Sequence, residues 1–124
     1  MPNWDIDDLP ERYREQVIAL EGRRKHIFNS EYEFELAVIE HAKLHGWEVY
    51  SIPDSRRASS SGYPDLTLAH AESGTLLFRE LKHGSNTTSE RQDVWLDSLK
   101  ACGADAAVWH SEDWLDIAKQ LIKK

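Results

Sequence analysis

The hydrophobic and polar positions of the chain follow two periodicities. Apolar residues three or four apart predict four helices, over about residues 9–21, 31–45, 89–103 and 111–122. Short apolar runs bounded by glycine, proline and polar residues predict four strands, at about 47–52, 66–69, 76–81 and 106–109. The predicted order is α-α-β-β-β-α-β-α, which indicates an α/β fold with a mixed β-sheet flanked by helices.

Polar residues mark where three of the predicted helices begin. Asn29 or Ser30 can cap the second helix, because a side-chain oxygen there accepts from a free backbone N–H of the first turn. Ser89, with Gln92 three residues later, has the spacing of a capping box. Ser111 is expected to cap the last helix in the same way.

The third predicted strand carries charge at its end. Side chains alternate between the faces of a strand, so Glu80 and Lys82 share one side of it with Phe78. Both faces are largely apolar, which indicates a central strand. Charges there are costly unless they are paired or bind a metal. The simpler reading is that the two residues lie just past the buried part of the strand, in solvent.

The second predicted helix also places acids on an apolar face. Phe34, Val38 and Ala42 form its buried stripe, and Glu31 and Glu35 lie one turn apart on that same stripe. Stabilisation of the helix N-terminus by negative charge is an alternative explanation, and it accounts for Glu31 better than for Glu35.

Length and composition restrict the class of protein. A chain of 124 residues with 40% apolar content is expected to form one domain over 1–124, with residues 1–29 as an N-terminal helical extension. A single cysteine excludes an internal disulfide. The polar start and the absence of a long apolar run predict a cytoplasmic protein without a membrane partner. The net charge of −7 argues against binding nucleic acid through bulk charge, but not against local contacts.

Three acidic positions can meet at one edge of the predicted sheet. Asp65 precedes the second strand and Glu80 ends the third, and Glu31 or Glu35 can join them from the helix. Carboxylate oxygens suit Mg²⁺ or Mn²⁺. A bound metal acidifies its water, and Lys82 can orient that water or stabilise charge on phosphorus. This set of groups is suited to the hydrolysis of a phosphodiester.

Pro64-Asp65 followed by Glu80-Leu81-Lys82 resembles the PD-(D/E)xK nuclease motif. More narrowly, the chain resembles the virus-type replication-repair nuclease (VRR-NUC) domains, especially the small stand-alone phage and bacterial forms. The resemblance covers about residues 30–122. Its supporting segments are Ser30-Glu31, Gly46-Trp47, Ser55-Arg56-Arg57, Gly62-Tyr63, the helix with Ser89, Gln92 and Trp95, and Val108-Trp109 with Asp113-Trp114.

The resemblance implies a restriction-endonuclease-like fold and a set of site residues. Asp65 and Glu80 would be metal ligands with the Leu81 carbonyl as a third, and Lys82 would be the catalytic lysine. Gln92 matches a family glutamine near the active site, although its capping role is an equal explanation. Relatives often have glutamine where Glu35 stands. Glu31 is therefore the favoured helix acid, and Glu35 is either an added ligand or a source of repulsion.

Stand-alone relatives resemble Holliday-junction resolvases. The resemblance therefore implies a homodimer that cleaves branched or junction DNA in replication, recombination or repair, in a bacterial cell or a phage-infected host. Arg56, Arg57 and His83 are the candidate phosphate contacts. The alternative is a non-catalytic nucleic-acid-binding or protein-interaction module with a nuclease-like fold, which the acidic net charge favours.

Overall fold

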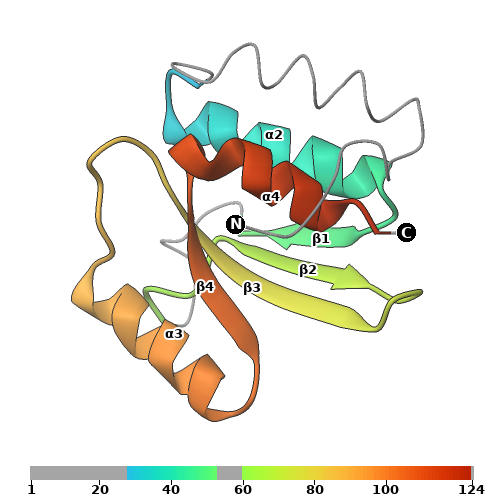
Figure 1. The fold of residues 1–124 in the computed structure, drawn as a ribbon. Coiled ribbons are helices and arrows are strands. Elements are labelled where there is room, and N and C mark those ends of the chain that lie inside the picture. The colour runs from blue at the N-terminus through green and yellow to red at the C-terminus, as the bar shows by residue number, and fades with distance from the viewer. Residues whose placement is uncertain (1–27, 53–59, 124) are drawn as a thin grey trace.

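The computed structural model describes residues 28–52 and 60–123. The first predicted helix, over 9–21, lies outside these residues. The remaining predicted order is confirmed, and Figure 1 shows the elements. They are α2 (Glu31–Leu44), β1 (Glu48–Ser51), β2 (Leu66–His70), β3 (Thr75–Lys82), α3 (Glu90–Ala101), β4 (Asp105–His110), the 3₁₀ turn η3 (Ser111–Asp113) and α4 (Trp114–Leu121). None of the described helices is long and apolar enough to cross a bilayer.

The four strands form one mixed sheet in the order β1-β2-β3-β4. β1, β2 and β3 pair antiparallel, whereas β3 and β4 pair parallel. Helices α2 and α4 lie side by side over one face, and α3 lies on the other side, next to β4 (Figure 1). The predicted α/β class and the interior position of β3 are therefore both confirmed.

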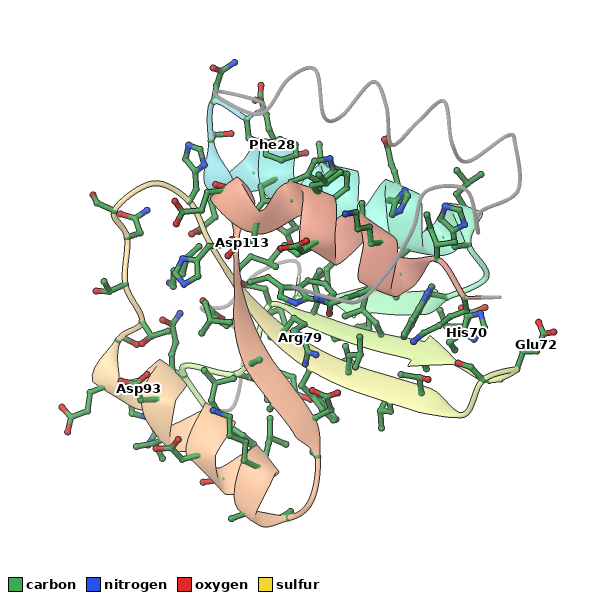
Figure 2. The ribbon with its side chains drawn as sticks, in the orientation of Figure 1. Phe28, His70, Glu72, Arg79, Asp93 and Asp113 are labelled. Carbon is green, nitrogen blue, oxygen red and sulfur yellow. The ribbon has the colours of Figure 1, made fainter. Side chains whose placement is uncertain are left out.

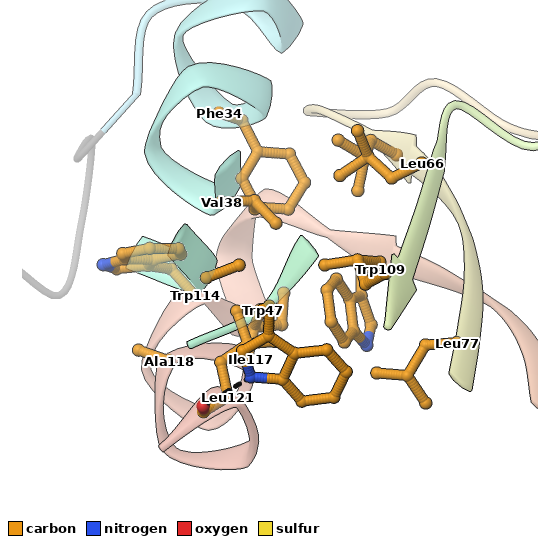
Figure 3. Packing of buried hydrophobic residues seen from close by; sticks show 13 residues of the cluster. Phe34, Val38, Trp47, Leu66, Leu77, Trp109, Trp114, Ile117, Ala118 and Leu121 are labelled. Atoms are coloured by element: carbon orange, nitrogen blue, oxygen red, sulfur yellow. Dashed lines mark hydrogen bonds between the residues drawn. The ribbon is translucent and has the colours of Figure 1, made fainter. Parts of the chain in front are cut away.

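The hydrophobic core lies between the sheet and the helix pair α2–α4. Phe34 and Val38 of α2 are fully buried against apolar side chains of α4 and the strands, as Figure 3 shows. The Trp47 indole donates a 2.8 Å hydrogen bond to the Leu121 carbonyl, which ties the end of α4 to the start of β1. Burial of each large apolar side chain contributes roughly 2 kcal/mol, so this core anchors α2 over the sheet.

Two predicted helix caps are confirmed and one is wrong. Ser30 accepts from the Glu33 N–H at 3.1 Å, and Ser89 and Gln92 form the capping box of α3. Ser111 does not cap the last helix, because α4 begins three residues later, after the η3 turn. The Ser111 hydroxyl instead shares a 2.7 Å hydrogen bond with Nδ1 of His83.

A buried arginine joins the two parallel strands. Arg79 of β3 donates to the Asp105 carbonyl at 2.8 Å and forms a 2.9 Å ion pair with the Asp105 carboxylate. Its guanidinium also lies 5.0 Å from the ring centre of Trp109. Figure 2 shows Arg79 where β3 and β4 run side by side, with His70 and Glu72 at the turn end of the β2–β3 hairpin. The opposite, open end of this hairpin carries Asp65 and Glu80.

Candidate active site

Strand register brings the two motif acids together. Leu66 of β2 pairs with Arg79 of β3, so one further step along the ladder brings Asp65 opposite Glu80. Asp65 Oδ2 accepts a 2.8 Å hydrogen bond from the Leu81 N–H. Asp65 thus continues the β2–β3 pairing with its side chain, and its carboxylate is held beside the end of β3.

Glu80 is the most enclosed acid of the site. The residue is only 2% exposed, and Oε2 accepts from both Gln92 Nε2 at 2.7 Å and Lys82 Nζ at 3.1 Å. Lys82 is itself buried. Because Glu80 and Lys82 share a face of β3, Lys82 reaches the same Glu80 oxygen that Gln92 contacts from the start of α3. The predicted pairing of Glu80 with Lys82 on one face is therefore confirmed, and neither residue is in solvent.

The surroundings of Glu80 favour its protonated form. Burial raises the pKa of Glu80 to about 7, and the negative charge of Asp65 acts in the same direction. The hydrogen bond and charge of Lys82 oppose this rise. A carboxyl group with such a pKa exchanges its proton near neutral pH, so a proton competes with any cation that Glu80 binds.

The start of α2 adds two acids to the same electrostatic neighbourhood. Burial raises the pKa of Glu35, followed by the negative charges of Asp65 and then Glu31. Both glutamates are half-buried, as expected for acids on the apolar stripe of α2. The helix dipole would lower the pKa of an acid in the first turn, so it does not account for the raised pKa of Glu35. The charge of Asp65, which lies outside α2, contributes to that rise.

The donor atoms of the site fit a hard divalent cation. Within residues 28–52 and 60–123, Oε1 of Glu31 and Oε1 of Glu80 are buried and accept no hydrogen bond. Buried carboxyl oxygens without partners are costly, and a cation would satisfy them. Three or more acidic, histidine or cysteine side chains do not converge into a complete cage among the described residues. Two carboxylates with a backbone carbonyl and water suit Mg²⁺, which keeps several waters.

Gln92 makes the capping contact and also a contact with Glu80. Its Oε1 accepts from the Ser89 N–H at 2.9 Å and completes the capping box, while its Nε2 donates to Glu80. Capping α3 and contacting Glu80 are therefore compatible. The amide oxygen accepts from Ser89, and the amide nitrogen donates to Glu80.

The remaining predicted site residues have two different outcomes. Arg56 and Arg57 lie outside the described residues. His83 is half-buried next to Lys82, with Nδ1 on Ser111, and its contact with phosphate stays a prediction. Leu81 is buried, with its N–H on Asp65, and the role of its carbonyl also stays a prediction.

Three residues of the site region make contacts that the sequence analysis did not predict, although Gly62 and Trp95 stand in segments of the family resemblance. Ser60 and Gly62 precede the Pro-Asp pair, and Trp95 lies one turn after Gln92. Ser60 accepts a hydrogen bond from the Trp95 indole, and Gly62 has a positive φ of +86°. The glycine two residues before the Pro-Asp pair was the sequence signal for a close backbone contact at this position. Glycine tolerates a positive φ, and its lack of a side chain allows another backbone to approach closely.

The fold and this site define a nuclease domain of the PD-(D/E)xK class. The family model described as the VRR-NUC domain matches residues 10–113, which is most of the chain. The chain belongs to the VRR-NUC family.

Solved structures agree with this fold. One, described as a VRR_NUC domain, aligns with a TM-score of 0.61 and 21% identity over 73% of this chain and 94% of its own. A second, a VRR_NUC domain protein, has a TM-score of 0.58 and 21% identity, and the alignment covers 77% of this chain and 89% of that protein. The Holliday junction resolvase Hjc of Archaeoglobus fulgidus reaches 0.49 and 20% identity over 63% and 64%, a likeness too low to bear on function. None of the curated proteins compared with the chain matches it significantly.

Proposed function

We propose that this protein is a metal-dependent endonuclease that hydrolyses phosphodiester bonds in DNA. The observation that carries the proposal is the arrangement around Glu80. This buried carboxylate lies opposite Asp65, has one oxygen on Lys82 and Gln92, and has its other oxygen without a partner among the described residues. Membership of the VRR-NUC family supports the same activity.

The proposed metal is Mg²⁺ or Mn²⁺. Asp65, Glu80 and the Leu81 carbonyl would hold it, with Glu31 as the favoured helix acid and Glu35 as the alternative. When bound, such a cation acidifies water and withdraws charge from the phosphate. Glu31 is favoured because its buried Oε1 has no partner in the described part of the chain. Glu35 stays the alternative because the negative charge of Asp65 contributes to its raised pKa, after burial.

Lys82 supplies the positive charge of the site. Its Nζ lies 3.1 Å from Glu80 Oε2, and Glu80 therefore holds the ammonium at the end of β3. A buried ammonium at this position can stabilise negative charge that develops on the phosphate during hydrolysis. Gln92 donates to the same Glu80 oxygen, so it fixes the carboxylate that orients Lys82.

The proposed substrate is branched or junction DNA, bound by a homodimer in the cytoplasm of a bacterial cell or a phage-infected host. Two sites related by a two-fold axis suit a substrate with the same symmetry. Arg56, Arg57 and His83 are the proposed phosphate contacts. The two arginines would provide local positive charge in a chain of net charge −7.

A digest of a DNA panel tests the proposal. Linear, flapped, nicked and four-way-junction DNA would be incubated with the protein and Mn²⁺, with chelator, and with the Asp65→Ala variant. We expect Mn²⁺-dependent cleavage of branched DNA by the wild type only. Equal cleavage by Asp65→Ala would contradict the assigned site. DNA binding without cleavage, together with no Mn²⁺ binding at millimolar concentration, would favour the non-catalytic module.

A further inference from the structure

The segment that leads into Asp65 is attached to the first two turns of α3. Ser60 Oγ accepts a 3.2 Å hydrogen bond from Arg91 Nη2 and a 3.3 Å hydrogen bond from Trp95 Nε1. Both donors belong to α3, one residue before Gln92 and three residues after it. The segment thus contacts the helix that carries the hydrogen-bond donor to Glu80.

Gly62 lies close against the backbone of α3. A Cβ atom added to Gly62 would lie 2.6 Å from the Arg91 carbonyl carbon, 2.7 Å from its oxygen and 2.8 Å from the Gln92 nitrogen. Real Cβ atoms essentially never approach within 3.0 Å of such neighbours. Since all three atoms belong to the backbone, no change of rotamer relieves the overlap. Any larger side chain must therefore push the segment and the start of α3 apart.

Aromatic packing extends the same contact toward β3. The Tyr63 ring lies edge-on to Trp95 of α3, with 5.0 Å between ring centres, and edge-on to Phe78 of β3 at 6.4 Å. Phe78 is on the same face of β3 as Glu80 and Lys82. Segment, helix and strand therefore pack together beside the site.

Gly62 is connected to both carboxylates of the site, through the chain to Asp65 and through Gln92 to Glu80. Asp65 follows Gly62 by three residues, and Gln92, whose backbone Gly62 touches, donates to Glu80. We infer that Gly62 is a positioning residue: its close approach to α3 sets the geometry of the Asp65–Glu80 pair through the segment on one side and Gln92 on the other. This inference rests on the proposed function, because it concerns how that metal site is held.

Gly62→Ala tests the inference, and Gly103→Ala is the matched control. Gly103 has the same φ of +86°, but a Cβ atom added there would meet nothing within 4 Å, so its substitution adds backbone strain without the overlap. Mn²⁺ affinity by calorimetry and the kinetics of DNA cleavage would be measured for both. We expect Gly62→Ala to bind Mn²⁺ about 10- to 100-fold more weakly, as when groups that orient metal ligands are removed. We expect kcat to fall with KM for DNA almost unchanged, and Gly103→Ala to match the wild type.

Two gentler variants keep the test decisive if Gly62→Ala does not fold. Ser60→Ala removes the acceptor shared by Arg91 and Trp95, and Trp95→Phe removes one donor but keeps an aromatic ring against Tyr63. We expect a smaller loss of Mn²⁺ affinity and kcat in each. Wild-type values in all the folded variants would overturn the role of Gly62. A wild type that neither binds Mn²⁺ nor cleaves DNA would overturn the proposed function, and this inference with it.

Discussion

The side-chain amide of Gln92 joins α3 to Glu80: its nitrogen donates to the carboxylate at 2.7 Å while its oxygen completes the helix cap. A residue that is fixed at both ends of its amide cannot rotate without losing one bond. The helix cap therefore also orients a proposed metal ligand, and the two functions can be separated by substitution.

Gln92→Glu separates them by keeping the cap and removing the donor. Glutamate completes a capping box as well as glutamine does, but it brings negative charge beside Glu80. We expect α3 to remain folded while Mn²⁺ affinity at neutral pH falls about 10- to 100-fold. Calorimetry and circular dichroism would measure the two effects. The converse variant, Ser89→Ala, should cost about 1 kcal/mol of stability with Mn²⁺ affinity unchanged. Unchanged affinity in Gln92→Glu would contradict the role of the donor.

Metal affinity should depend on pH through Glu80. Since its pKa is about 7, a proton must leave before a cation binds, and the apparent Mn²⁺ affinity should rise as pH increases through 7. Calorimetry from about pH 5.5 to about pH 8.5, which brackets this pKa by roughly 1.5 units on each side, would show the rise. An affinity independent of pH in this window would contradict the assignment of Glu80 as a ligand that must lose a proton.

The same titration predicts a stability change without metal. Glu80 has a higher pKa in the folded state than in the unfolded state. The stability that this difference provides is fully present below pH 4.5, the ordinary pKa, and is lost as the pH rises to about 7. The free energy of unfolding should fall by roughly 2–3 kcal/mol across this range relative to Glu80→Gln, which does not titrate. Urea denaturation at a series of pH values measures it. Parallel curves for the two proteins would be inconsistent with a buried, protonated Glu80.

The two helix acids should respond differently to neutralisation. Glu31→Gln removes negative charge from a buried, unpartnered oxygen, so we expect weaker Mn²⁺ binding. Glu35→Gln removes a carboxylate whose ionisation is opposed by burial and by the charges of Asp65 and Glu31, so we expect equal or tighter binding. The pair of variants is its own control, because both make the same chemical change on adjacent turns of α2. The opposite order of affinities would make Glu35 the helix ligand.

Arg79 and Asp105 should have unequal effects on stability. Asp105→Ala leaves a buried guanidinium without its carboxylate, and we expect a loss of about 1–2 kcal/mol. Arg79→Met also removes the hydrogen bond to the Asp105 carbonyl, but it leaves no buried charge, and the Asp105 side chain is 61% exposed, so its loss should be smaller. Urea denaturation would compare both with Asp97→Ala on exposed α3, which should change stability by less than about 0.5 kcal/mol. A larger loss of stability in Arg79→Met than in Asp105→Ala would contradict this prediction.

Much of the fold was predictable because its signals are local. Periodicity identified α2 and the four strands to within one or two residues, and the Ser89–Gln92 spacing identified the cap of α3. The prediction for Ser111 was wrong because the η3 turn precedes α4, and the Ser111 hydroxyl contacts a distant residue, His83. The contact with His83 cannot be read from the residues around Ser111. As a result of the η3 turn, α4 begins at Trp114.

The acids of the site were predictable from strand parity, but their protonation was not. The alternation of side chains placed Glu80 with Lys82, whereas the raised pKa of Glu80 depends on burial in the folded chain and on the charge of Asp65. The contact of Gly62 with α3 was also hidden, since it joins Gly62 to Arg91 and Gln92, which are distant in sequence. Such effects arise only once the chain has packed.

Cleavage of branched DNA by Lys82→Met in the presence of Mn²⁺, beside Lys100→Met, tests the central claim most directly. Lys100 is exposed at the far end of α3, so its variant makes the same change away from the site. The assay belongs near pH 8.5, about 1.5 units above the pKa of Glu80, where that carboxylate is ionised. We predict that Lys100→Met cleaves like the wild type and that Lys82→Met is slower by roughly 100- to 1,000-fold. Equal rates for the two variants would contradict a catalytic site built on Asp65, Glu80 and Lys82.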